Sequence, residues 1–320
     1  MDVICLGELL VDMFPSEIGR SLVDVSSFRP KPGGAPANVA VALARLGRKS
    51  AFIGKVGDDA FGHHLAGVLA QAGVDVSGVR YDDYARTTMA FIASPDANRA
   101  EYLFYRNPGA DTRLKVEELD HALLKQTKVL HFGSLSLVED PIRSALLQAV
   151  RIVQEAGGRI SLDVNYRPSL WSSPEDAYSA LLDILPQVDL LKVNEVELAL
   201  MTGEDDPESG SKKLMQHGPT ICVLTAGTGG SYFRVAGGFG FVPAFKVDTI
   251  DATGCGDAFI AGLLSRLSYR EDWRGDLPSE EFGHHLQYAN AVGALTAMKQ
   301  GVIPALPGAE AVADFLSKQP

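Results

Sequence analysis

The chain has 320 residues, of which 46% are hydrophobic and 22% charged. A sequence of this length and apolar content can bury a large core, which excludes a disordered protein and a single small module. Its 29 Lys and Arg against 40 Asp and Glu give a net charge of −11, so no broad basic face is expected for nucleic acid or an anionic membrane. Any anion must therefore be bound at one small site and not by a broad basic surface.

Cysteine usage and the start of the sequence indicate a cytoplasmic protein. Cys5, Cys222 and Cys255 show no CxxC or paired spacing, which argues for a reducing compartment and against a disulfide scaffold or a zinc site. The first residues include Asp2 and lack the order of a signal peptide. The longest uncharged stretch, 214–233, is interrupted by glycine and proline, so we expect no membrane span.

Short apolar runs alternate with helical patterns along most of the chain, which predicts an α/β fold with a mostly parallel sheet covered by helices. The expected strands are 3–7, 50–56, 129–133, 160–164, 190–193 and 221–225. The expected helices are 38–46, 62–72, 141–156, 195–201, 257–267 and 282–299. In the first helix Val39, Leu43 and Leu46 recur at helical spacing, and Gly47 supplies a stop.

Two segments of the amino-terminal third break this alternation. In 86–106, apolar runs flank the turn-forming residues 94–98, which predicts a β-hairpin. We expect this segment and 14–32 to form a small antiparallel β-sheet that stands off the main sheet. The expected domains are thus a lid, 14–32 and 86–106, and a core made of 1–13, 33–85 and 107–320.

A glycine-rich loop, 251–257, follows a strand-like stretch at 245–247 and runs into an apolar helix. Gly254 and Gly256 let backbone amides converge at a helix start, which favours an anion. Asp257 would repel a bound phosphate unless it takes a proton from the hydroxyl that attacks that phosphate. As structure alone, it would be an ordinary first-turn acid. The glycine spacing fits neither the dinucleotide motif nor a Walker motif.

A second glycine-rich helix start lies at 33–38. Gly33 and Gly34 would let a ligand touch the backbone, while Asn38 offers both a donor and an acceptor, which suits sugar hydroxyls. As structure alone, the glycines would form a tight turn and Asn38 a local cap. Two such helix starts more than 200 residues apart require a joint explanation.

Together these residues resemble the two signatures of the PfkB, or ribokinase-like, carbohydrate kinases, over essentially the whole chain. The matches are Gly7-Glu8 with Asp12, Gly33 to Gly57, Asp163-Val164-Asn165-Tyr166-Arg167, Asn194-Glu195-Val196-Glu197, Thr225-Ala226-Gly227 and Asp251 to Asp257. Segments 104–111 and 301–307 are most similar to fructokinases. The resemblance implies a three-layer ribokinase-like fold with a β-sheet lid, and transfer of the γ-phosphoryl group of ATP to a primary hydroxyl, for fructose the one on C6.

The resemblance also implies roles for the matching residues. Asp257 would be the base, and its amide with those of Gly254, Cys255 and Gly256 would stabilise the phosphoryl group. The sugar site would contain Asp12, Gly33, Gly34, Asn38, Arg106, Asn107, Asn165 and Arg167. The last of these is also a candidate phosphate clamp. The nucleotide site would contain Asn194, Thr225, Gly227, Gly256 and Asn290.

Two cation sites are implied as well. Asn194 and Glu197 would hold Mg²⁺ through water, although the same pair fits an ordinary helix capping box. K⁺ would be held, largely through carbonyls, by Asp251, Thr253, Thr296, Lys299 and Gly301. Ala305 stands where ribokinases offer a serine, which leaves dependence on K⁺ open. The histidines show no metal-ligand spacing.

Cys255 is a departure from the family pattern, and so is Ala252. A thiol at a helix start has a lowered pKa, which predicts oxidation-sensitive activity, while the alternative is an inert small residue. In either case the backbone amide of residue 255 remains for the anion cradle.

The small sheet would act as a lid that excludes water, and its exposed apolar face predicts a homodimer formed lid to lid. The expected partner is a small-molecule sugar. Three other functions stay open: a related kinase for 2-keto-3-deoxygluconate, ribose or a nucleoside; a non-catalytic kinase-like scaffold; and a nicotinamide oxidoreductase, against which the glycine spacing argues.

Overall fold

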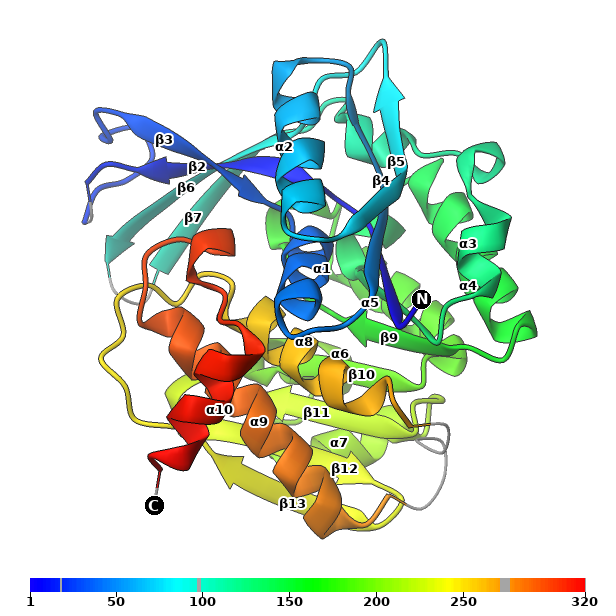
Figure 1. The fold of residues 1–320 in the computed structure, drawn as a ribbon, viewed down its shortest axis with the longest axis vertical. Helices are drawn as coiled ribbons and strands as arrows, with labels where there is room; N and C mark the ends of the chain where they lie inside the picture. The colour runs from blue at the N-terminus through cyan, green and yellow to red at the C-terminus, as the bar shows by residue number, and fades with distance from the viewer. Residues whose placement is uncertain (18, 97–98, 271–276, 320) are drawn as a thin grey trace.

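A large sheet with helices on both faces and a smaller sheet beside it make up the protein (Figure 1). The computed structural model describes residues 1–17, 19–96, 99–270 and 277–319. The strand order of the large sheet is β13-β12-β11-β10-β9-β8-β1-β4-β5. Neighbours from β11 to β5 are parallel, whereas β12 and β13 add antiparallel strands at one edge.

All six predicted strands are present in the large sheet. Its strands are β1 (Val3–Leu6), β4 (Ser50–Gly57), β5 (Asp75–Asp82), β8 (Val129–Gly133), β9 (Arg159–Asp163), β10 (Leu190–Asn194), β11 (Ile221–Thr225), β12 (Gly230–Val235) and β13 (Gly238–Pro243). The sequence analysis missed β5, β12 and β13, which lie at or next to the edges, where exposed polar and glycine residues weaken the apolar pattern. The strand-like stretch at 245–247 is a loop.

The helices cover both faces of this sheet, and all six predicted ones are present. They are α1 (Ala35–Arg45), α2 (Ala60–Gln71), α3 (His121–Lys125), α4 (Ile142–Glu155), α5 (Pro174–Ile184), α6 (Glu195–Thr202), α7 (Pro207–Met215), α8 (Cys255–Leu267), α9 (Ser279–Ala297) and α10 (Ala309–Ser317). One apolar cluster packs α1, α2, α8 and α9 on one face, and a second packs α4 to α7 on the other. No helix in the described ranges is long and apolar enough to cross a membrane.

The smaller sheet has the order β3-β2-β6-β7. Its strands are β2 (Leu10–Pro15), β3 (Phe28–Gly33), β6 (Met89–Asp96) and β7 (Arg99–Tyr105). The predicted hairpin is confirmed as the antiparallel pair β6–β7, although residues 97–98 of its expected turn lie outside the described residues. The β2–β3 pair is also antiparallel, while β2 and β6 pair in parallel. The sheet begins at Leu10, so the expected boundary at residue 13 cuts through β2, and Asp12 belongs to the small sheet.

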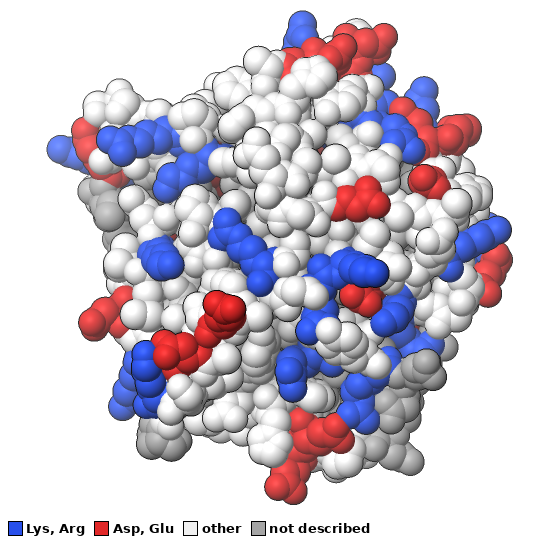
Figure 2. Space-filling view, viewed as in Figure 1, with Lys and Arg blue, Asp and Glu red and all other residues white. Residues whose placement is uncertain are grey.

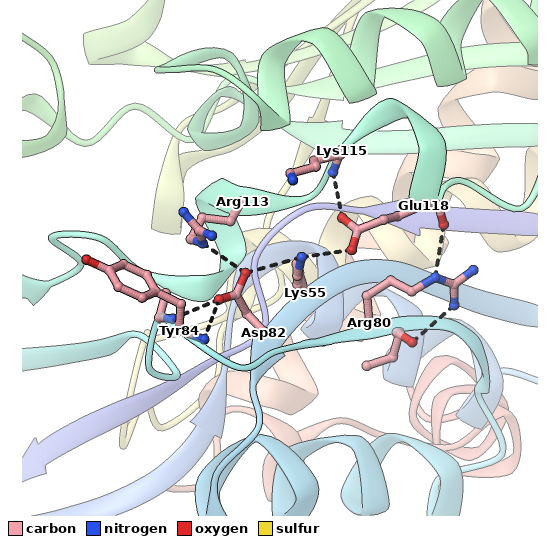
Figure 3. A network of polar contacts seen from close by, with 9 residues as sticks. Lys55, Arg80, Asp82, Tyr84, Arg113, Lys115 and Glu118 are labelled. Atoms are coloured by element: carbon pink, nitrogen blue, oxygen red, sulfur yellow. Dashed lines mark hydrogen bonds and ion pairs between the residues drawn. The ribbon is translucent and has the colours of Figure 1, made fainter.

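A network of buried charges braces the point where the chain leaves β5 for the small sheet (Figure 3). Asp82, with a side chain only 2% exposed, lies 3.2 Å from the Lys55 ammonium and accepts a 2.8 Å hydrogen bond from Arg113 Nε. Its Oδ1 also accepts from the backbone amides of Tyr84 and Ala85. Burial alone would raise the pKa of Asp82, but these hydrogen bonds outweigh it and hold that pKa well below its usual range.

Glu118 extends the network to the segment before α3. Its Oε1 lies 2.8 Å from Lys55 Nζ, its Oε2 accepts from the Lys115 amide, and its backbone carbonyl accepts from Arg80 Nε (Figure 3). Because Lys55 lies on β4 and Arg80 on β5, the network joins two neighbouring strands to the segment after the small sheet. It thereby fixes the base on which the small sheet stands.

Replacing Asp82 by Asn should destabilise the protein by about 3 kcal/mol, since it leaves the buried Lys55 with one carboxylate fewer. A depressed pKa means that Asp82 stabilises the fold fully above its unfolded pKa of about 4 and loses this contribution as the pH falls below that value. Urea unfolding of wild type and variant at pH 7 and at pH 3 measures both effects.

The exposed pair of Asp58 and His63, whose side chains are more than half exposed, offers the control. Asp58→Asn should change stability by less than about 1 kcal/mol. Equal losses from the two substitutions would contradict the bracing role of the buried network.

Candidate active site

A cleft of about 300 Å³ lies where the carboxyl ends of the parallel strands meet the small sheet. Asp163 ends β9, Asn194 ends β10 and Thr225 ends β11, and all three line the cleft. Tyr102 and Phe104 of β7 line it from the small sheet. The cleft thus has the position in which open parallel sheets bind ligands, with a second wall from the small sheet.

Two residues predicted from separate motifs meet in this cleft. Asn38 Nδ2 donates a 2.8 Å hydrogen bond to Asp257 Oδ2, although the residues are 219 positions apart. Asn38 is not a cap as the alternative interpretation proposed, because α1 begins at Ala35, with Gly34 as the N-cap residue, and Asn38 lies inside its first turn. Asp257 lies in the first turn of α8. The amino termini of α1 and α8 therefore converge.

Three carboxyl groups lie at the end of the cleft where the amino termini of α1 and α8 converge. Burial raises the pKa of Asp257 to about 6, against the hydrogen bond from Asn38, which lowers it. Burial also raises the pKa of Asp12 to about 7, and the negative charge of Asp257 adds to this. The pKa of Glu8 rises to about 7 for the same reason, burial. These groups share one low-dielectric site, which resists holding all of them ionised.

Glu8 was quoted within a motif but not predicted as a site residue. Its Oε1 accepts from the Ala35 amide at 2.9 Å, while its Oε2 is buried without a hydrogen-bond partner among the described residues, as is Asn38 Oδ1. Buried acceptors of this kind cost free energy until a donor reaches them. They line the cleft, so hydroxyl groups of a bound molecule can satisfy them.

Lys192 is a cation that the sequence analysis missed. Its Nζ lies 2.9 Å from both oxygens of Asp163, and both side chains are buried. Burial opposes its charge, but the carboxylates of Asp163 and Glu197 outweigh this and raise the pKa of Lys192. A Cβ atom on Gly256 would lie 3.5 Å from Lys192 Nζ, so the ammonium group faces the start of α8. The cleft therefore carries a fixed positive charge beside the predicted anion cradle.

Asn194 and Glu197 form the capping box that was the structural alternative for this pair. Asn194 Oδ1 accepts from the Glu197 amide, and Glu197 Oε2 accepts from the Asn194 amide. Glu197 Oε1 accepts from the Tyr166 amide, and burial raises the pKa of this carboxyl. Both residues also line the cleft. Because backbone amides occupy both carboxylate oxygens, the pair fits a hydrated Mg²⁺ ion better than direct coordination.

The predicted anion cradle begins α8. Gly254 is its N-cap residue with a left-handed φ of 76°, and the first amides of a helix have no partner within it. The Cys255 amide also reaches the Ala252 carbonyl at 3.3 Å. Val302 packs against Phe14 of the small sheet and lies so close that a Cβ on Gly254 would be 2.2 Å from its Cγ1. The cradle and the small sheet thus share one apolar contact.

The predicted activation of the Cys255 thiol is wrong. Burial raises its pKa to about 12, and the nearby Asp251 and Asp257 carboxylates add to the effect. Burial, together with the two carboxylates, outweighs the helix start, because a thiolate here would be a third negative charge in a poorly solvated place. The alternative, an inert small residue, agrees with this environment.

The remaining residues that were predicted for the sugar site divide into two groups. Arg167 and Asn165 line the cleft, and the Arg167 guanidinium lies 5.2 Å from the ring of Tyr102. Arg106 is instead buried behind the cleft, where its Nε donates to Asp111 Oδ2 at 2.7 Å, so it does not line the cleft as a residue of the sugar site would. Asn107 is exposed and does not line the cleft.

Gly33 does not line the cleft but is needed beside it. A Cβ atom at that position would lie 1.9 Å from Asp12 Oδ2, so only glycine leaves room for that carboxylate. Gly34, with a φ of 104°, does line the cleft. The glycine pair therefore serves two purposes, space for Asp12 and the turn into α1.

Of Thr225, Gly227 and Asn290, which were predicted for the nucleotide site, only one lines the cleft. Thr225 lines it, whereas Gly227 lies just beyond, at the turn after β11. Asn290 donates to the carbonyls of Val242 and Pro243 and accepts from Ser231, which ties α9 to the β12–β13 hairpin. Its side chain thus has a structural task of its own.

The predicted K⁺ residues are connected through Asp251. Its Oδ1 accepts from the Thr253 amide and its Oδ2 from the Gly301 amide, each at 2.9 Å. The Thr296 hydroxyl is buried and donates to Val292, while Lys299 is exposed. Over the described residues, no group of three or more His, Cys, Asp or Glu side chains could hold a metal ion. A cation here would need carbonyl ligands, and the K⁺ site stays a prediction.

The chain is similar to known proteins over nearly its whole length. The sequence model described as pfkB family carbohydrate kinase matches residues 1–309. The chain is 44% identical to fructokinase-1 of Oryza sativa subsp. japonica, over 95% of this chain and 94% of that protein. The structure of a Xylella fastidiosa fructokinase with bound ATP superposes with a TM-score of 0.90, at 32% identity and 99% coverage of both chains. A Vibrio cholerae O395 fructokinase bound to fructose, ADP and calcium gives a TM-score of 0.87, at 32% identity and 98% coverage of both.

The two cradle glycines provide a matched test of the geometry. Gly254→Ala should destabilise the protein by about 1–3 kcal/mol, because alanine meets both a left-handed φ and the side chain of Val302. Gly256→Ala should change stability by less than about 1 kcal/mol, because its nearest neighbour is 3.5 Å away and alanine favours helices. Urea denaturation midpoints measure both, and equal losses would contradict the description of the loop.

Proposed function

Because the chain belongs to the pfkB family of carbohydrate kinases, with the ribokinase-like α/β fold, and is a sugar kinase, we propose that it transfers the γ-phosphoryl group of ATP to the C6 hydroxyl of fructose. The observation that carries this proposal is the position of Asp257: in the first turn of α8, in the cleft, with its carboxylate bonded to Asn38. A base and an anion cradle share one helix start, which is the arrangement that phosphoryl transfer to a hydroxyl requires.

Asp257 takes the proton of the attacking hydroxyl. With a pKa of about 6 it is mainly ionised at neutral pH, yet basic enough to accept that proton. As the sugar oxygen forms its bond to the γ-phosphorus, the bond from phosphorus to the β-phosphate oxygen breaks and ADP leaves. Asn38 donates to one oxygen of Asp257 and so leaves the other free for the hydroxyl.

The growing charge on the phosphoryl group is met by the start of α8 and by Lys192. The amides of Gly254, Cys255, Gly256 and Asp257 are the donors that we assign to this task, and fixed donors at a helix start stabilise a transition state without reorganising. Lys192 is held by Asp163 and faces Gly256, so it supplies a positive charge at the same place. Arg167, at the edge of the cleft, is the second candidate clamp.

The sugar end of the cleft favours a neutral polyol. Glu8, Asp12 and Asn38 present acceptors there, and two of these atoms have no partner among the described residues. A carboxylate-bearing sugar such as 2-keto-3-deoxygluconate would be repelled by this acidic group, whereas hydroxyls can donate to it. The identity to fructokinases supports fructose over ribose or a nucleoside.

We further propose where the cofactors bind and how the protein associates. ATP would extend from the cradle toward Thr225 and Gly227, with Mg²⁺ held through water by Asn194 and Glu197; when bound, the ion neutralises phosphate charge. K⁺ would lie near Asp251 and the Gly301 loop. The exposed Leu103 and Tyr105 on β7 support a homodimer through the small sheet acting as a lid, and we place the protein in the cytoplasm.

Substituting Asp257 by Asn should lower turnover by about 10²–10⁴-fold, because it removes the base while keeping the hydrogen-bonding shape. ATP binding, measured by calorimetry, should stay close to wild type. The wild-type kcat/KM should fall about tenfold per pH unit below pH 6, since a protonated Asp257 cannot accept the hydroxyl proton. Asp58→Asn, on an exposed residue, is the control; a variant Asp257→Asn with full activity would remove this residue as the base.

A panel of sugars in a coupled assay for ADP release tests the substrate. Fructose should give the largest kcat/KM, ahead of ribose, a nucleoside and 2-keto-3-deoxygluconate. Glu8→Gln should raise KM for the preferred sugar more than it lowers kcat, because Glu8 contacts the sugar and not the transferred group. ADP release with none of these sugars would contradict the fructose assignment, and a higher rate with 2-keto-3-deoxygluconate would contradict the electrostatic argument.

A further inference from the structure

A cluster of cations lies on a protein whose net charge is −11. Figure 2 shows Lys and Arg side chains gathered near the middle of one face, where Figure 1 places the ends of α1 and α8 beside the amino terminus. We call the residues Arg48, Lys49, Lys128 and Arg266 the basic patch. The composition excluded a broad basic face, but it could not exclude a local one, because the positions of charges depend on the fold.

The basic patch and the cleft lie at opposite ends of the parallel strands of the large sheet. Lys49 and Lys128 directly precede β4 and β8, which flank β1, so they lie at the amino-terminal ends of three neighbouring parallel strands. The backbone amides of Asp2 and Lys128 donate to the carbonyls of Lys49 and Met1, which holds these segments together. The cleft lies at the carboxyl ends, so the patch is not part of it.

Two aromatic rings order the guanidinium groups of the basic patch. The Arg48 guanidinium lies 3.7 Å from the ring centre of Tyr269, the second residue after α8, and Lys128 Nζ lies 5.8 Å from the centre of the same ring. Arg266 lies 5.2 Å from the ring of Tyr288, on α9. Stacking of this kind orients the guanidinium plane but leaves its N–H groups without acceptors.

Among the described residues, the carboxylate in contact with these cations is that of Asp2. It lies 3.0 Å from Lys128 Nζ and also accepts from the Lys49 amide. The Nε and Nη1 atoms of Arg48 are buried and have no hydrogen-bond partner in the described part of the chain. Burial lowers the pKa of Arg48, and the charge of Arg266 lowers it further, while Asp2 opposes the change. Over the described residues, the patch therefore carries more positive than negative charge.

We propose that the basic patch is a second binding site, for a small anion that carries a phosphate group. The Arg48 guanidinium, ordered against the ring of Tyr269, supplies one positive charge for the phosphate group. Arg266 and Lys128 add charge from two other segments, which suits an anion of charge −2. The site is independent of the proposed transfer reaction, because it lies at the amino-terminal ends of the parallel strands and uses none of the cleft residues.

Calorimetry with inorganic phosphate tests the site in the presence of saturating ADP and Mg²⁺, which occupy the proposed active site. Wild type should bind phosphate, and Arg48→Gln/Arg266→Gln should bind it at least tenfold more weakly. Arg151→Gln is the matched control, because it removes one positive charge from an exposed side chain on α4, outside the patch. Its affinity for phosphate should equal that of wild type.

Two further measurements complete the design. Lys128→Gln, on a side chain that is 54% exposed, keeps the fold and should weaken phosphate binding several-fold even if the double variant unfolds. Glycerol 3-phosphate, compared with inorganic phosphate, tells whether the site prefers a phosphate ester or the free ion, and either result supports it. Absence of binding of both, or equal affinities in wild type, Lys128→Gln and a folded double variant, would overturn the proposal. Since the readout is binding and not turnover, it does not depend on whether fructose is the substrate.

Discussion

The hydrogen bond between Asn38 and Asp257 joins the two halves of the active cleft. It holds together the first turns of α1 and α8, which come from the two ends of the sequence. Because each helix start is positioned by the strands it packs on, the geometry of this contact depends on the parallel sheet. Bringing distant segments together costs loop entropy, which the buried clusters on both faces of the sheet offset.

Around that contact the protein separates its charges. Glu8, Asp12 and Asp257 lie at the proposed sugar end, where burial raises their pKa values to between about 6 and 7. Lys192 lies on the side that we assign to the phosphate groups, and it is paired with Asp163. An acidic enzyme can thus bind an anionic cosubstrate, since one buried cation and one helix start act over a short distance in a poorly solvated place.

The sequence predicted strands and helices of the buried core well, because their apolar residues recur with the period of each element. Strands β5, β12 and β13 escaped prediction, since partly exposed strands at or near the sheet edge carry polar and glycine residues. The motif residues Asn38, Asp257 and Arg167 could be assigned to one site, because the family resemblance links them. Lys192 could not, since a lysine in a strand has no local pattern that reveals its buried carboxylate partner.

Two residues show what tertiary contacts decided against the local pattern. Arg106 was expected over the sugar, but Asp111 five positions later holds it behind the cleft. Cys255 begins a helix, which alone would lower its thiol pKa, yet burial and two carboxylates raise it. For Arg106 the deciding partner is near in sequence, and for Cys255 the deciding effect is burial, but both depend on the folded backbone.

By itself, then, the sequence determined the fold class, the two glycine-rich helix starts and the acid that would act as base. It also determined that anions must be bound locally, because its net charge is −11. Only the tertiary structure decided where the positive groups gather. They form one cradle beside Lys192 and a separate basic patch at the opposite ends of the parallel strands. The reason is that charge is summed along a sequence, whereas electrostatic interactions depend on distances and burial that folding alone sets.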